Sequence, residues 1–197
     1  MTRVLLLIAA LLALPAAAQE RDGRTAVATF ASGCFWCTES DFAKVPGVID
    51  VVSGYTGGTV ANPSYQQVSA GGTGHAEAVE VRYDPKVVGY ERLLEVYWRN
   101  VDFLDGGGQF CDRGDQYRPA VFVHDAAQRK AAERSKAELE GSGRFDRPVA
   151  VQIVAAGPFY PAEDYHQDYA LKNPIRYRFY RYNCGRDARL AELWQGS

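Results

Sequence analysis

The chain has 197 residues and a nearly balanced charge, with 22 Lys and Arg residues against 24 Asp and Glu residues and a formal net charge of −2. Its 47% hydrophobic and 23% charged residues are ordinary for a globular protein and exclude a disordered or fibrous chain. The absence of a basic run argues against nucleic acid as the main partner. The length predicts a single domain.

The first eighteen residues have the pattern of a secretory signal peptide. Arg3 precedes an apolar run at 4–14, and Pro15 separates that run from small residues that end at Ala18. The run is too short to cross a membrane. We therefore expect cleavage of residues 1–18, leaving 19–197 as one exported catalytic domain, periplasmic in a Gram-negative source and without stable membrane association. An uncleaved membrane anchor is the alternative.

Short strands and helices are predicted in mixed order by the spacing of apolar residues. We expect strands at 25–31, 48–55, 76–83, 120–123 and 149–155, and helices beginning near residue 34 and at 90–101, 126–139 and 162–172. Residues 102–118 form a long glycine-rich loop, and the tail at 175–197 looks flexible. The predicted fold class is α+β: a small mixed β-sheet with packed helices and long irregular loops, in a ferredoxin-like two-layer arrangement.

Cysteines in an exported chain indicate either disulfides or redox chemistry. A zinc site is not expected, because a single C-x-x-C pair and three scattered histidines lack the usual ligand spacing. Two bridges among the four cysteines could be drawn in three ways. The four are Cys34, Cys37, Cys111 and Cys184.

Cys34 lies where a predicted strand leads into a helix. A thiol in the first turn of a helix faces unpaired N–H groups and the positive end of the helix dipole, so we expect a lowered pKa. Cys37, three residues on, could reach Cys34 across one helical turn. The alternative for Cys34 is a small buried thiol without reactivity or a local structural disulfide. Phe35 and Trp36 flank Cys34 and could either wall an apolar pocket for a side chain such as methionine or belong to the core.

Several segments resemble, in order and in spacing, the motifs of the peptide methionine sulfoxide reductase A family. The resemblance runs from about Thr25 to Pro174, most of the mature chain. Any one motif could arise by chance, whereas the ordered set is specific. The segments are G-C-F-W-C-T-E at 33–39, G-Y-T-G-G at 54–58, N-P-S-Y at 62–65, T-G-H-A-E at 73–77, D-R-G-D-Q-Y-R at 112–118 and F-Y-P-A-E-D-Y-H-Q at 159–167.

The resemblance implies a peptide-methionine (S)-S-oxide reductase that repairs oxidised proteins. By resemblance Cys34 is the nucleophile and becomes a sulfenic acid, Glu77 supplies the proton, and Asp112 orients the site. Tyr65 and Tyr117 would help to bind the sulfoxide oxygen. These roles suit the chemistry, because a desolvated carboxyl keeps its proton at neutral pH and phenols donate towards an oxygen that gains charge.

The same resemblance implies partners and substrates. Phe35 and Trp36 would bind the substrate, which is free methionine sulfoxide or an oxidised protein or peptide. No bound cofactor and no metal are implied, and an external thiol reductant, a thioredoxin-like protein or a dithiol, completes the cycle. We expect a monomer.

Two cysteines can resolve the sulfenic acid as a disulfide. The family has glycine where Cys37 stands, and many members resolve near the C-terminus, where Cys184 lies. Cys37 has the shorter loop to close, but a rigid helical turn could hold the sulfurs apart. Cys184 is slightly favoured as the resolving cysteine, because a mobile tail can expose the resulting disulfide to a reductant. Cys111, where the family usually has asparagine, is either an uninvolved thiol or a third relay member.

Two other functions fit weaker features of the sequence. A C-x-x-C pair at a helix start in an exported chain also suits a thioredoxin-like thiol oxidoreductase, which would ignore sulfoxides. Two stable disulfides with aromatic loop residues would suit a binding domain that has no reactive thiol.

Overall fold

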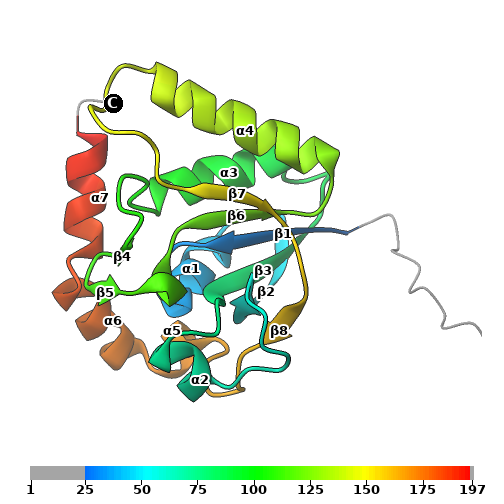
Figure 1. The fold of residues 1–197 in the computed structure, drawn as a ribbon, viewed down its shortest axis with the longest axis vertical. Helices are drawn as coiled ribbons and strands as arrows, with labels where there is room; N and C mark the ends of the chain where they lie inside the picture. Colours follow the sequence, from blue (N-terminus) through cyan, green and yellow to red (C-terminus); the bar gives the residue numbers. More distant parts are fainter. Residues whose placement is uncertain (1–24, 196–197) are drawn as a thin grey trace, which may run out of the picture.

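The computed structural model describes residues 25–195, so the predicted signal peptide lies outside the described residues. A six-stranded sheet runs through the molecule in the order β7-β6-β1-β3-β2-β8 (Figure 1). Its strands are β1 (Ala26–Ala31), β2 (Val48–Thr56), β3 (Ala76–Tyr83), β6 (Ala120–Val123), β7 (Gln152–Ala155) and β8 (Phe159–Pro161), and β4 (Gly108–Gln109) and β5 (Asp112–Arg113) form a separate ribbon.

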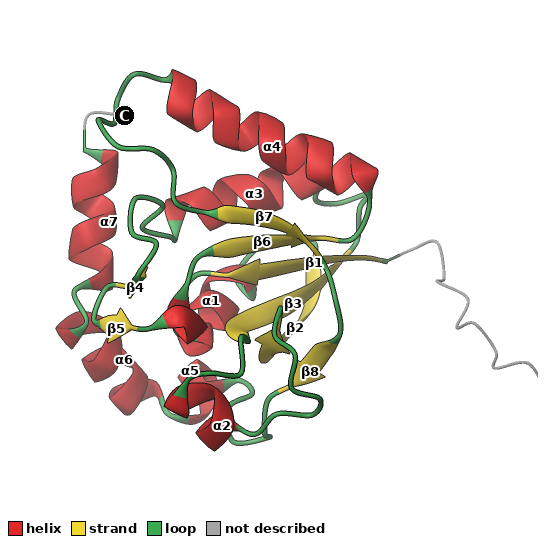
Figure 2. Ribbon diagram, in the orientation of Figure 1, coloured by secondary structure: helices red, strands yellow, loops and turns green. Residues whose placement is uncertain are grey.

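Helices surround this sheet, and long loops join the short elements (Figure 2). The helices are α1 (Phe35–Phe42), α2 (Tyr65–Ala70), α3 (Tyr90–Arg99), α4 (Ala126–Gly141), α5 (Tyr169–Lys172), α6 (Pro174–Asn183) and α7 (Arg186–Trp194), with a 3-10 turn at Asp115–Tyr117. Within residues 25–195, every helix is too short or too polar to span a bilayer.

The pairing of the strands brings distant residues to one edge of the sheet. β6 and β7 are parallel, and the other pairs of the sheet are antiparallel. Because β1 and β3 run in opposite directions, the end of β1 and the beginning of β3 lie at the same edge. Cys34 follows the end of β1, and Glu77 is the second residue of β3. The sheet topology therefore places this thiol and this carboxyl near each other.

The main core forms where α1 and α3 pack on β1. The ring of Phe30 stacks on Phe42 of α1 at 4.8 Å and on Tyr97 of α3 at 5.3 Å between centroids. Leu93 and Leu94 are also fully buried, as the spacing of apolar residues in this helix predicts. This packing fixes α1 against the sheet and so fixes the residues at its N-terminus.

The predicted α+β fold with a mixed sheet is confirmed, and most elements lie within a few residues of their expected bounds. The expected helix at 162–172 is wrong, because only Tyr169–Lys172 is helical there. The side chain of Gln167 instead extends the edge of β2. Its Oε1 accepts from the N–H of Ser53 at 2.9 Å, and its Nε2 donates to the Ser53 carbonyl at 2.9 Å.

The expectation of a flexible tail is also wrong, since α6 and α7 occupy most of it. These helices are held by ion pairs that apolar periodicity does not reveal. Arg181 pairs with Asp41 at 2.9 Å and with Asp187 at 2.7 Å. Arg186 is 2% exposed and donates to the carbonyl of Ser32 at 3.1 Å.

Candidate active site

Cys34 occupies the N-cap position of α1, directly after the turn that follows β1. Gly33 makes this turn with φ of +83°, a conformation that favours glycine, and a Cβ there would lie 2.5 Å from the Cβ of Gln109. The carbonyl of Cys34 accepts from the N–H groups of Cys37 and Thr38 at 3.1 and 3.3 Å. The thiol is thus held at a fixed point at the edge of the sheet.

A cavity of about 60 Å³ opens at this thiol. It brings together seven of the nine predicted site residues, and Tyr180, which was not predicted, completes the lining. The predicted residues are Cys34, Phe35, Trp36, Tyr65, Glu77, Asp112 and Tyr117. The two remaining predictions, Cys37 and Cys184, lie near this group through contacts described below.

Glu77 is the buried acid of the cavity, with 2% of its surface exposed. Its Oε2 accepts from the backbone N–H of Phe35 at 3.1 Å, which ties the carboxyl to the first turn of α1. Burial raises the pKa of Glu77 to about 8, and the hydrogen bond from Phe35 opposes this only in part. The carboxyl therefore carries a proton at neutral pH.

Two phenols face the same cavity. Tyr65 begins α2, and its backbone N–H donates to Oε1 of Glu163 at 2.8 Å. Burial, and after it the charge of Glu77, raises the pKa of Tyr65 to about 12 and also raises the pKa of Tyr117. Both hydroxyls therefore remain protonated and can donate hydrogen bonds to an oxygen in the cavity.

Asp112 accepts a hydrogen bond from Tyr180 and lies beside a disulfide. The Tyr180 hydroxyl donates to Oδ2 of Asp112, and Cys184 Sγ lies 3.9 Å from the same oxygen. Cys184 forms a disulfide with Cys111, with a Cα–Cα distance of 4.8 Å. This bridge ties the strand that carries Asp112 to the end of the helix that carries Tyr180. Cys184 is therefore the C-cap of α6 and not part of a mobile tail.

The Cys111–Cys184 disulfide also affects whether a metal ion could bind at this position. Cys111, Asp112 and Cys184 place their ligand atoms within 4.8 Å of one another. Both sulfurs are bonded to each other, so the intact bridge leaves no thiolate to bind an ion.

Cys34 and Cys37 are free thiols that interact directly. The prediction of a lowered pKa for Cys34 is wrong in this structure: burial, then the hydrogen bond and charge of Cys37, raises the pKa well above its usual value. The pKa of Cys37 instead falls to about 7, through the hydrogen bond from Cys34 and the charges of Arg186 and Arg181. The two sulfurs therefore share one negative charge near neutral pH.

Aromatic residues hold the apolar wall of the cavity in place. The indole N–H of Trp36 donates to Nδ1 of His166 at 3.0 Å, and Tyr169 stacks on Trp36 at 3.7 Å between centroids. His166 is 1% exposed and also contacts the rings of Phe35 and Tyr65, at 4.9 and 4.5 Å. His166 lies in the Y-H-Q segment of the sequence, whereas no motif pointed to Tyr180.

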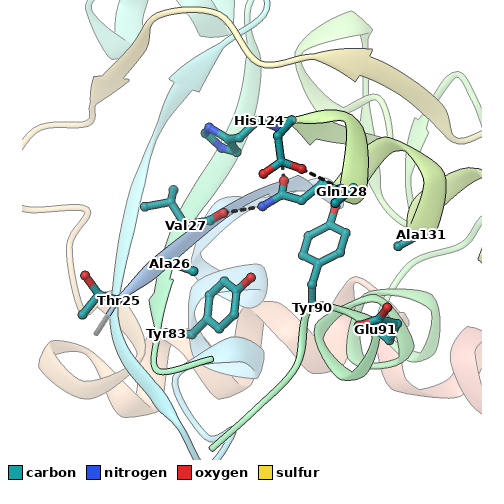
Figure 3. Close-up of a pocket in the computed structure, with 11 residues that line it drawn as sticks. Thr25, Ala26, Val27, Tyr83, Tyr90, Glu91, His124, Gln128 and Ala131 are labelled. Atoms are coloured by element: carbon teal, nitrogen blue, oxygen red, sulfur yellow. Dashed lines mark hydrogen bonds between the residues drawn. The ribbon is translucent and has the colours of Figure 1, made fainter. Parts of the chain in front are cut away.

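A roomier cavity of about 380 Å³ lies elsewhere, between the beginning of β1 and α4 (Figure 3). Gln128 donates to the carbonyl of Val27 at 2.7 Å at this site, and His124 and Tyr90 also line it. None of its lining residues is a cysteine or a predicted site residue. Its residues offer no nucleophilic thiol, which distinguishes it from the smaller cavity at Cys34.

Comparison with known sequences shows the family of the chain. The profile of the peptide methionine sulfoxide reductase family matches residues 26–197. A Bacillus licheniformis protein named peptide methionine sulfoxide reductase MsrA is 54% identical over 168 residues, which cover 85% of this chain and 93% of the relative. A Vibrio cholerae protein named peptide methionine sulfoxide reductase MsrA/MsrB is 53% identical over 167 residues, but this chain spans only 44% of that relative.

Solved structures show the same fold. Reduced Mxr1 from Saccharomyces cerevisiae matches with a TM-score of 0.73 and 33% identity, covering 78% of this chain and 88% of that one. Methionine sulfoxide reductase A of Corynebacterium diphtheriae matches with a TM-score of 0.68 and 32% identity, covering 79% and 78%. The family profile and these relatives agree with the sequence motifs and the cavity, and they show that the chain belongs to the peptide methionine sulfoxide reductase A family.

Proposed function

We propose that this methionine sulfoxide reductase acts on the S epimer, free and in oxidised proteins, by attack of Cys34 on the sulfoxide sulfur. One observation carries the proposal: the Cys34 thiol shares its small cavity with the carboxyl of Glu77, which burial keeps protonated at neutral pH. Sulfoxide reduction by a thiol needs these two groups, because the sulfur must be attacked and the departing oxygen must be protonated.

The first step transfers the sulfoxide oxygen to the enzyme. The Cys34 thiolate attacks the substrate sulfur, Glu77 protonates the oxygen, and the Tyr65 and Tyr117 hydroxyls donate to that oxygen as charge develops on it. This attack forms a bond between the two sulfurs as the sulfur–oxygen bond of the substrate breaks and the protonated oxygen leaves as hydroxide. The hydroxide then adds to the Cys34 sulfur, and the sulfur–sulfur bond breaks, which releases methionine and leaves a Cys34 sulfenic acid. The thiolate comes from the charge that Cys34 shares with Cys37. Phe35 and Trp36 hold the apolar part of the substrate.

Cys37 is the proposed partner for the second step. It already hydrogen-bonds with Cys34, whereas Cys184 is bonded to Cys111. Attack of the Cys37 thiolate on the sulfenic sulfur forms a Cys34–Cys37 disulfide and releases water. An external dithiol then reduces this disulfide, and the dithiol is oxidised in turn.

We expect Cys37→Ser, assayed with the Cys111–Cys184 bridge intact and without reductant, to form methionine once and to retain Cys34 as a sulfenic acid. Dimedone labelling and mass spectrometry should find an adduct on Cys34 in this variant. Cys184→Ser is the matched control and should give no adduct, since Cys37 remains available. An adduct in Cys184→Ser but not in Cys37→Ser would make Cys184 the resolving cysteine.

The reductant is proposed to be a thioredoxin-like protein or a small dithiol. One structure of the yeast relative Mxr1 is a complex with Trx2. We also propose export of this chain to the periplasm after cleavage at Ala18, which the pattern of residues 1–18 supports. N-terminal sequencing of the exported protein should then begin at Gln19.

The test of the reaction uses the reduced enzyme with methionine sulfoxide peptides of each epimer and dithiothreitol. Methionine should form from the S epimer and not from the R epimer. Turnover of the R epimer at a similar rate would overturn the stereochemical assignment. No turnover of either epimer by the folded protein would overturn the proposed reaction.

A further inference from the structure

Exposed apolar side chains are concentrated in one short part of this chain. Of the seven large hydrophobic side chains that the described residues expose, five lie between residues 165 and 182. Four of these are 71–83% exposed, and we call them the α6 stripe: Leu171, Ile175, Phe179 and Tyr182. Isolated exposed apolar residues are common in soluble proteins, but a contiguous set indicates an interaction site.

The spacing of these residues places them on one side of α6. Ile175, Phe179 and Tyr182 are separated by four and three residues, which is the repeat of one helix face. Leu171 belongs to α5, directly before α6. Other side chains of α6 face inward, since Tyr177 is 7% exposed and Arg181 pairs with Asp41. The helix is thus anchored by one side and leaves the α6 stripe uncovered by described residues.

Helix α6, which carries most of the stripe, adjoins the catalytic cavity. Tyr180, in the same helix, lines the cavity beside Cys34. Tyr169, in α5, stacks on Trp36, which forms the cavity wall. In Figure 1, α5 and α6 lie next to each other below the β4–β5 ribbon. A polypeptide with an oxidised methionine in the cavity must pass over its rim, and α6 forms one side of that rim.

Positive charges accompany the apolar side chains. Arg176 and Arg178 of α6 are exposed and form no ion pair with a described residue. The positive charge of Lys172 is partly balanced by Asp168, with 4.0 Å between Nζ and Oδ2. A partner that covers this surface would therefore gain from apolar side chains together with nearby carboxylates.

We propose that the α6 stripe binds the polypeptide next to an oxidised methionine, and that it favours extended segments with apolar and acidic side chains. The inference rests on the proposed function and names the class of polymeric substrate. The ten residues of α6 span about 15 Å, which matches four or five residues of extended chain. Free methionine sulfoxide has no such chain and gains nothing from this surface.

The test compares free and peptide-bound substrate in the double variant Ile175→Ser/Phe179→Ser. The peptide carries one methionine S-sulfoxide flanked by Leu, Phe and Glu. We expect kcat/KM for the peptide to fall about tenfold, through KM, while kcat/KM for free methionine S-sulfoxide changes by less than about twofold. The matched control is Ile49→Ser/Val87→Ser, which removes the two exposed apolar side chains outside this region and should change neither value.

A second variant, Arg176→Glu/Arg178→Glu, tests the charges. It should lower kcat/KM for the acidic peptide more than kcat/KM for a peptide in which Gln replaces Glu.

The serine variant has two outcomes that contradict the proposal. Equal losses of kcat/KM for free and peptide substrate would mean that the α6 stripe supports the fold, and no loss for either substrate would mean that the stripe is not used. Anionic phosphatidylglycerol vesicles provide a further arm. Vesicle binding that the serine variant loses, with peptide kinetics unchanged, would assign the surface to a membrane instead. Failure of wild-type enzyme on the free substrate would overturn the proposed reaction, a separate outcome.

Discussion

Replacement of Cys34 by serine is expected to lower the rate of methionine formation from the S-sulfoxide by a factor on the order of 10⁵ or more. A serine hydroxyl is not ionised near neutral pH and cannot form a sulfenic acid, so neither the attack nor the later disulfide is available. The geometry offers no substitute, because no other thiol among residues 25–195 lines the cavity. Methionine formed from a peptide S-sulfoxide, measured by chromatography, checks the result.

The matched control for this variant is Cys111→Ser/Cys184→Ser. It also removes sulfur atoms, but it leaves Cys34, Glu77 and Cys37 in place, so it should still form methionine. Circular dichroism should show that both variants are folded. Methionine formation by Cys34→Ser at more than a few per cent of the wild-type rate would exclude Cys34 as the nucleophile.

Replacement of Glu77 by glutamine is expected to lower kcat/KM by about 10²- to 10⁴-fold, the usual contribution of a positioned general acid. Glutamine keeps the shape of the side chain and an oxygen that can accept from Phe35, but it has no acidic proton. The pH profile gives a second readout. Wild-type activity should rise as the Cys34–Cys37 pair loses its first proton near pH 7 and fall as Glu77 loses its proton near pH 8. The fall above pH 8 should be absent in Glu77→Gln.

The same variant should be more stable than wild type at alkaline pH. The pKa of Glu77 is about 8 in the folded protein against a reference value of 4.5, so folding favours the neutral carboxyl. Its contribution to the free energy of unfolding is complete below pH 4.5 and is lost as pH rises to 8. That loss amounts to about 5 kcal/mol at most, since one pKa unit corresponds to about 1.4 kcal/mol.

Urea unfolding of wild type and Glu77→Gln at several pH values measures this difference. The stability of the variant relative to wild type should increase between pH 5 and pH 8 and then level off. Glu138→Gln is a suitable control, because Glu138 lies on α4 outside the cavity and its side chain is 70% exposed. A difference that does not change with pH would contradict the buried, protonated state of Glu77.

Local sequence patterns were enough to predict the central strands, whereas Glu77 was singled out beside Cys34 only by the resemblance to the family motifs. The strand at 76–83 follows from strict alternation, and it carries Glu77 to the edge where β1 delivers Cys34. The pKa of Cys34 could not be predicted in this way. Its helix position favours a thiolate, but burial and the neighbouring Cys37 thiol outweigh that effect, and both depend on tertiary packing.

Long-range partners explain the other differences between sequence and structure. Tyr180 lies in a segment for which no helix was predicted, and it reaches the site through its hydrogen bond to Asp112, 68 residues away. The Cys111–Cys184 pairing is one of several that the sequence allowed. Helix α6 depends on ion pairs such as Arg181 with Asp41, which no local pattern indicates.

The Cys111–Cys184 bridge closes a loop of 73 residues that contains β5, β6, α4, β7, β8, α5 and α6. By chain entropy, a loop of this length stabilises the folded protein by about 4 kcal/mol, a large fraction of the stability of an ordinary domain. Cys111 is exposed, so the thiol that regenerates Cys34 can also reach this bridge. An enzyme that completes many cycles without loosening its own fold therefore needs a bridge that is harder to reduce than its catalytic disulfide.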